Sequence, residues 1–99
     1  IIETENVIIS TGSESASLPG IKFDEKVIVS STGALSLNTV PKKMVVIGGG
    51  YIGLEMGTVY HALGSQVTMV EFMPTLLTGA DEDLVKPLAR KLKKSFANI

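Results

Sequence analysis

The sequence has no cysteine and no tryptophan, and it has only one histidine in 99 residues. Because cysteine is absent, the chain holds no disulfide framework, no thiolate metal site and no thiol nucleophile. With a single histidine besides, we expect no metal site. No apolar run approaches the ~20 residues that a membrane-spanning helix requires. The chain therefore has little of what thiol, metal or membrane functions need.

Excess positive charge is also missing, since the formal net charge is −1. A surface that gathers nucleic acid is usually strongly basic, so we expect no nucleic-acid partner. Most basic residues do gather at positions 86–94, directly after three acidic residues at 81–83. The dipole of a helix favours this order, so a solvated helix explains it better than a nucleic-acid patch.

The length and the 44% hydrophobic content suit one small core. A doubly wound dinucleotide domain normally contains two mononucleotide-binding halves, and the patterns below supply little more than one. The sequence begins at Ile1 with no initiator methionine and no targeting leader. We therefore expect a piece of a longer protein with a cut or processed start.

The region before Pro41 contains short elements only. Two brief apolar runs, Val7–Ile9 and Val27–Val29, predict two buried strands. Ser30 or Ser31 is expected to cap a short helix after the second run. That helix must end before the proline, because the residue preceding a proline is pushed out of helical geometry.

The region after Pro41 has a stronger pattern. Met44–Ile47 is an uninterrupted apolar run, typical of a parallel strand covered on both faces. Helical spacing from Tyr51 to Leu63 predicts a helix, with Gly64 as its left-handed C-terminal cap. Val67–Val70 predicts a second buried strand. The apolar residues expected to face the core from this helix are Ile52, Met56, Val59 and Leu63.

A last helix is predicted from Asp81, as its N-cap, towards Phe96. Pro87 would lie inside it and cost ~3 kcal/mol, so we expect a kink or a later start. The apolar side of this helix is expected to be Leu84, Val85, Leu88 and Leu92. The predicted fold class is thus α/β, a partial Rossmann-type parallel sheet with a β-α-β-α unit, preceded by a short segment of another domain.

The glycine motif Gly48-x-Gly50-x-x-Gly53 lies between the first predicted strand and the helix of this unit. Gly48 would allow the tight turn, Gly50 would let a pyrophosphate approach the backbone, and Gly53 would bring the helix close to the strand. With Tyr51 and Ile52, the glycines form a helix start whose unpaired amides suit phosphate without any metal. The alternative is a turn that only packs a helix on a sheet.

Glu71 ends the second strand about 20 residues beyond Gly50, where dinucleotide-binding folds place an acidic residue. A carboxylate there accepts hydrogen bonds from both ribose hydroxyls of NAD and repels the 2′-phosphate of NADP. The only arginine of the chain is Arg90, far along the sequence. We therefore predict NAD rather than NADP; the alternative for Glu71 is a solvated carboxylate.

The sequence of Val46–Gly57 resembles that of the flavoprotein disulfide reductases, and within them that of the dihydrolipoamide dehydrogenase group. The resemblance covers nearly the whole chain up to about Lys94. It also includes Ile8–Ser13, Leu18–Ile21, Ser30–Leu37 and Val70–Phe72.

This resemblance implies that residues 1–38 close an FAD-binding domain and that residues 42–99 begin an NAD-binding Rossmann domain. Thr11 and Gly12 match a stretch that lies against FAD, Tyr51 a position covering the flavin, and Glu55 a position near the nicotinamide. Without the resemblance, Thr11 and Gly12 are an ordinary turn, Tyr51 a helix-start aromatic and Glu55 a solvated carboxylate.

For the whole protein the resemblance implies oxidation of dihydrolipoamide through a disulfide and FAD to NAD, in a homodimer that joins a 2-oxo acid dehydrogenase complex. The implied location is the mitochondrial matrix in a eukaryote and the cytoplasm in a bacterium. The disulfide, the acid-base histidine and the FAD glycine motif are not in this sequence, so we expect no catalytic residue here and take His61 as a packed or surface residue. The alternatives are another FAD/NADH oxidoreductase, such as an NADH oxidase or ferredoxin-type reductase, and a non-catalytic structural fragment.

Overall fold

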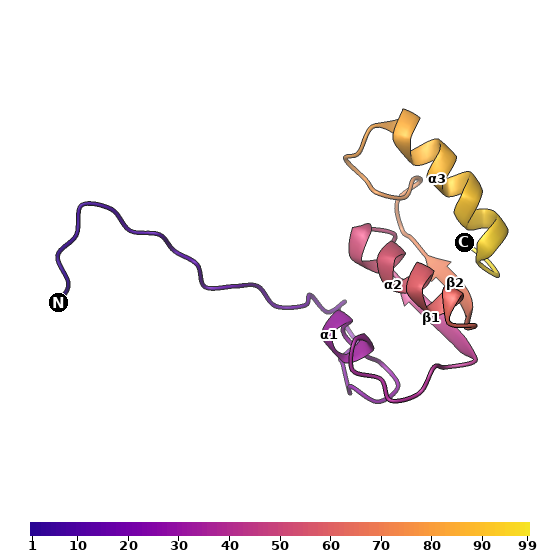
Figure 1. Cartoon of the computed structure of the whole chain (residues 1–99), viewed down its shortest axis with the longest axis horizontal. Helices are drawn as coiled ribbons and strands as arrows, with labels where there is room; N and C mark the ends of the chain where they lie inside the picture. Colours follow the sequence, from indigo (N-terminus) through magenta and orange to yellow (C-terminus); the bar gives the residue numbers. More distant parts are fainter.

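The computed structural model describes all 99 residues and contains one small α/β unit with a long N-terminal extension (Figure 1). Residues 1–18 have no secondary structure and run away from the unit as an extended chain. No helix is both long enough and apolar enough to cross a lipid bilayer. In chain order the elements are α1 (Ser31–Ala34), β1 (Lys43–Ile47), α2 (Tyr51–Ala62), β2 (Gln66–Val70) and α3 (Glu82–Ser95).

The two strands form a parallel sheet in which Lys43 pairs with Gln66 and Ile47 with Val70. This pairing confirms the predicted α/β unit, because a helix connects two adjacent parallel strands. After α3 the chain returns to the outer edge of β2, where the Met69 amide donates to the Asn98 carbonyl at 3.0 Å. A parallel bridge also joins Thr68 to Asn98. The last residues therefore pair with β2 where a third strand of the sheet would lie. The sequence did not predict this pairing.

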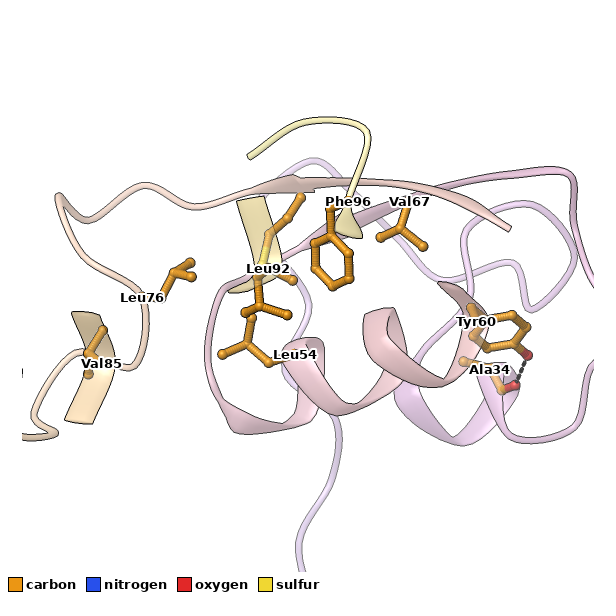
Figure 2. Packing of buried hydrophobic residues seen from close by; sticks show 9 residues of the cluster. Ala34, Leu54, Tyr60, Val67, Leu76, Val85, Leu92 and Phe96 are labelled. Atoms are coloured by element: carbon orange, nitrogen blue, oxygen red, sulfur yellow. Dashed lines mark hydrogen bonds between the residues drawn. The ribbon is translucent and has the colours of Figure 1, made fainter. Parts of the chain in front are cut away.

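The core lies on one face of this sheet only. Met44, Val46, Val67 and Met69 point to the side that carries the core, whereas Val45 is 64% exposed. The prediction that β1 is covered on both faces is wrong, because both long helices contribute to the same core. Figure 2 shows Leu54, Val67, Leu92 and Phe96 gathered on that side. The buried residues of the core are Ala34, Leu54, Tyr60, Val67, Met69, Leu76, Val85, Leu92 and Phe96.

Helix α2 buries a different face from the predicted one. Its buried residues are Leu54, Gly57 and Tyr60. Of the predicted residues, Met56 is partly buried against the core, whereas Ile52, Val59 and Leu63 are exposed. A Cβ on Gly57 would lie 2.9 Å from the Phe96 ring and 3.5 Å from Val67, so only glycine permits this approach. Gly57 therefore lets the face of α2 that carries Leu54, Gly57 and Tyr60 pack against the sheet. The predicted cap is confirmed, since Gly64 has a left-handed φ of +101°.

The two strands predicted before Pro41 do not form. Val7–Ile9 lie exposed in the extension, where no other segment pairs with them. Val27 and Ile28 belong to a turn that the Asp24 carboxylate organises, because it accepts hydrogen bonds from the amides of residues 26–28 at 2.8 Å each. The short helix is confirmed, with the Ser30 hydroxyl accepting from the Gly33 amide at 3.1 Å, although it ends at Ala34.

Helix α3 starts at Glu82 and passes through Pro87, so a later start is wrong. Pro87 cannot donate the helical hydrogen bond to the carbonyl of Asp83, and Asp83 is exposed, so this carbonyl is not buried without a partner. Val85 and Leu92 are buried as predicted, but Leu84 is exposed. Acidic residues occupy the first turn and Lys93 and Lys94 the last, the order that stabilises the helix dipole.

Helix α1 packs against α2 although the two lie on either side of the predicted domain boundary. The buried hydroxyl of Tyr60 donates to the Ala34 carbonyl (Figure 2). The Ser65 hydroxyl donates to the Pro41 carbonyl at 2.5 Å, and the Gln66 amide donates to the Lys42 carbonyl at 2.9 Å. Residues 30–42 are thereby fixed to the C-terminal end of α2.

Candidate functional site: the glycine turn and Glu71

The glycine turn joins the carboxyl end of β1 to the start of α2. Gly48 has a φ of +107°, a conformation that L side chains rarely adopt, so the turn requires glycine there. A Cβ on Gly53 would collide with the Gly48 carbonyl and lie 3.2 Å from Val46. This agrees with the predicted packing roles of Gly48 and Gly53, because both let the helix lie against the strand.

The start of α2 presents unpaired amides. Gly50 is the N-cap, and the first helical hydrogen bond runs from the Leu54 amide to the Gly50 carbonyl at 3.0 Å. The amides of Tyr51, Ile52 and Gly53 therefore have no acceptor within the chain. A Cβ on Gly50 would meet no atom within 4 Å, so the space beside it is open. This arrangement fits a pyrophosphate, because free amides and the helix dipole both favour an anion.

Glu71 lies directly after β2 and turns back towards the glycine turn. Its Oε2 accepts a hydrogen bond from the Gly49 amide at 2.5 Å, and its Oε1 accepts one from the Met73 amide at 2.7 Å. The hydrogen bonds from Met73 and Gly49 hold the pKa of Glu71 below its ordinary value of 4.5. The side chain is therefore a carboxylate at neutral pH, and each oxygen keeps a lone pair for a further donor.

The open side of the turn and the carboxylate face one shared cavity of about 410 Å³. Gly50, Tyr51 and Glu71 line it on one side, and residues 77–80 close it on the other. The structure thus brings together an anion-binding helix start and a hydrogen-bond acceptor that the sequence places about 20 residues apart.

Residues 1–98 match the family of pyridine nucleotide-disulphide oxidoreductases. The chain belongs to this family. Among its curated relatives, the mitochondrial dihydrolipoyl dehydrogenase of Dictyostelium discoideum is 54% identical over 93 residues, which are 94% of this chain and 19% of that protein. The dihydrolipoyl dehydrogenase of Trypanosoma brucei brucei is 57% identical over 94 residues, 95% of this chain and 20% of that protein.

A third relative has another name: the leghemoglobin reductase of Glycine max is 53% identical over 94 residues, 95% of this chain and 18% of that protein. The chain thus spans about a fifth of the length of these relatives. The predicted resemblance to the flavoprotein disulfide reductases, and to their dihydrolipoamide-oxidising group, is confirmed.

Two residues that match this family's pattern lie beyond the turn on α2. Tyr51 is exposed and lines both the shared cavity and a second, mainly apolar cavity of about 540 Å³. Glu55, one helical turn further on, lines only the second cavity, which also includes Leu88 and Leu92 of α3. Ile52 lines neither cavity, so its contribution to the site is its free amide.

The two residues expected to contact flavin lie apart from this site. Thr11 and Gly12 are exposed on the N-terminal extension, and a Cβ on Gly12 would meet no atom within 4 Å. The extension alone therefore forms no cradle for FAD. His61 is exposed, with its ring 6.1 Å from that of Phe96, and no cluster of metal-ligating side chains exists.

The sequence pattern did not predict three of the residues at the site. Gly49 stands at a variable position of the motif, and Leu76 and Leu77 lie in the connection after β2. The Leu77 amide donates to the Gly49 carbonyl at 2.9 Å, and the Leu76 side chain is buried near Gly49. The one available signal was that glycine also occupies position 49, which the motif leaves variable.

Proposed function

We propose that residues 42–99 form the first half of an NAD-binding domain, and that residues 1–38 close the FAD-binding domain of the same flavoprotein. The observation that carries the proposal is the shared cavity, which Gly50 and Tyr51 at the start of α2 line together with Glu71. Phosphates bind at the start of α2 and ribose hydroxyls at Glu71.

We assign different parts of the dinucleotide to different residues of the site. The amides of residues 51–53 hold the pyrophosphate, and Glu71 accepts hydrogen bonds from the adenosine ribose. Tyr51 and Glu55, which line the second cavity, are proposed to contact the flavin and the nicotinamide end of the dinucleotide. When bound, NAD supplies the hydride chemistry, while this chain's residues bind and orient it.

NAD is preferred to NADP for an electrostatic reason. Glu71 is negatively charged at neutral pH, so it repels a 2′-phosphate, and residues 72–80 contain no arginine or lysine to neutralise one.

For the whole protein we propose a dihydrolipoyl dehydrogenase that uses FAD and a redox disulfide outside this segment, as a homodimer in a 2-oxo acid dehydrogenase complex. Several relatives are named mitochondrial, which supports the mitochondrial matrix for a eukaryotic source; for a bacterial source we propose the cytoplasm. Relatives with nearly equal identity carry the names dihydrolipoyl dehydrogenase and leghemoglobin reductase. We infer that this segment specifies the nucleotide and that the second substrate is selected elsewhere.

The test replaces the matching segment of the Trypanosoma dihydrolipoyl dehydrogenase with this chain and compares the oxidation of NADH with that of NADPH. NADH should be strongly preferred, and Glu71→Ala should narrow the preference by about tenfold, equivalent to ~1.4 kcal/mol. Glu82→Ala is the matched control, because Glu82 is an exposed carboxylate that pairs only with Lys86. Equal use of both nucleotides by the unsubstituted chimera would refute the role of Glu71.

A titration of the 99-residue chain with NADH, followed by nicotinamide fluorescence, separates this function from a purely structural fragment. Saturable binding that Glu82→Ala leaves unchanged supports a nucleotide site. Absence of binding at millimolar NADH favours the structural fragment.

A further inference from the structure

Gly49 is held on three sides by the segment that follows β2. Its amide donates to Glu71 Oε2 at 2.5 Å, and its carbonyl accepts from the Leu77 amide at 2.9 Å. A Cβ at this buried residue would lie 2.5 Å from Leu76 Cδ2 and 3.0 Å from Glu71 Oε2. Both backbone polar groups and the open side of its Cα are therefore engaged by residues 71–77.

The segment that holds Gly49 is itself fixed. Leu76 is only 7% exposed and belongs to the hydrophobic core. Leu77 has a φ of +51°, a left-handed conformation that costs a non-glycine residue ~1–2 kcal/mol. Such a conformation persists when its surroundings determine it, and here the Leu77 amide and carbonyl are both bonded, to Gly49 and Ala80.

This arrangement leaves the ligand-facing groups free. The clamp, meaning residues 71–77 closed on Gly49, takes up one side of the turn, while Gly50 and Tyr51 line the shared cavity on the other side. Preorganised donors bind a ligand more tightly, because the loop loses less conformational freedom on binding.

We infer that Leu76 and Leu77 are positioning residues, which hold the pyrophosphate-binding turn and the Glu71 carboxylate as one preorganised unit for a dinucleotide. The inference rests on the proposed function and extends it, because neither leucine belongs to the glycine motif. It also explains why position 49 is glycine, because any side chain there would displace Leu76 or Glu71.

A double substitution in the full chain tests the clamp, with NADH titration as the measurement. Gly49→Ala should weaken NADH binding about tenfold, since the added Cβ forces Leu76 and Glu71 away. Leu76→Ala should weaken binding by a smaller factor. The double variant should bind NADH more tightly than Gly49→Ala alone, because the shortened side chain makes room for the new methyl group. Losses that multiply in the double variant would overturn the inference, since two independent structural defects behave in that way.

Leu84→Ala is the control for Leu76→Ala, because it removes the same atoms from an exposed position of α3. It should leave NADH binding unchanged. Far-UV circular dichroism identifies any variant that has lost its helices.

Amide hydrogen exchange tests the clamp without any ligand. The amides of Gly49 and Leu77 should exchange slowly together, and Leu76→Ala should speed both by about tenfold while Leu84→Ala does not. Rapid exchange of both amides in the unsubstituted chain overturns the clamp. If the unsubstituted chain binds no NADH, the proposed function fails, and slow coupled exchange would still support the clamp as the support of this turn.

Discussion

Tyr60→Phe tests whether one buried hydrogen bond attaches α1 to α2. Tyr60 is 6% exposed, and its hydroxyl is the only group that donates to the Ala34 carbonyl. Phenylalanine keeps the ring and its packing but leaves that carbonyl unpaired at a buried residue. A buried acceptor without a partner costs about 1–3 kcal/mol, so the free energy of unfolding should fall by that amount.

This loss is large for a chain of this size. At ~0.05–0.15 kcal/mol per residue, an intact domain of 99 residues has ~5–15 kcal/mol in total, and much of this chain is outside the core. Urea unfolding followed by circular dichroism measures the change. With a urea slope of ~1–3 kcal/mol per M, the midpoint should move by about 1 M.

The other tyrosine provides the matched control. Tyr51 is 70% exposed and its hydroxyl makes no hydrogen bond within the chain, so Tyr51→Phe should change stability by no more than ~0.5 kcal/mol. The effect of Tyr60→Phe should be concentrated at residues 31–37, where amide exchange should accelerate. Equal stability of the Tyr60 variant and the unsubstituted chain, or equal losses in both tyrosine variants, would refute the reasoning.

Three further predictions concern the turn, its carboxylate and the open sheet face. Gly50→Val should abolish most NADH binding with little change in circular dichroism, because the branched side chain fills the open space beside Gly50; undiminished binding would place the phosphates elsewhere. The pKa of Glu71 is lower in the folded chain than its ordinary value of 4.5, so its stabilising effect should be complete above pH 4.5 and disappear as the pH falls through the folded pKa. Glu71→Gln should remove this dependence in urea unfolding measured against pH. The chain should self-associate through the exposed face of Val45, Ile47 and Val70, and Val45→Lys should shift sedimentation towards monomer.

The elements after Pro41 could be predicted because their signals are local. An apolar run, a glycine turn, helical spacing and a glycine cap each act over a few residues, and the structure contains all of them at the expected positions. The proximity of the glycine turn and Glu71 could also be predicted, because each follows one of two adjacent parallel strands, whose carboxyl ends meet at one edge of the sheet.

The buried face of α2 could not be predicted because it depends on a residue far along the chain. Apolar spacing favoured Ile52, Val59 and Leu63, but the helix turns its small face inward so that Gly57 meets Phe96. The two early strands failed for a related reason. An apolar run such as Val7–Ile9 becomes a strand only beside a partner, and none of the described residues lies next to it.

The glycine motif identifies where a phosphate binds, but it does not say what keeps the turn in place. A loop built from Gly48, Gly49 and Gly50 has the greatest backbone freedom of any sequence, and ordering it costs conformational entropy. In this chain Glu71 and the Leu76–Leu77 pair order the turn before any ligand binds. They do so through two hydrogen bonds to Gly49 and the buried side chain of Leu76, which offset the loss of conformational entropy. The carboxylate that we propose as the ribose acceptor therefore also fixes the turn. Losing it should weaken binding of the pyrophosphate as well as binding of the ribose, and a comparison of adenosine with ADP binding would separate the two contributions, because only ADP carries the diphosphate.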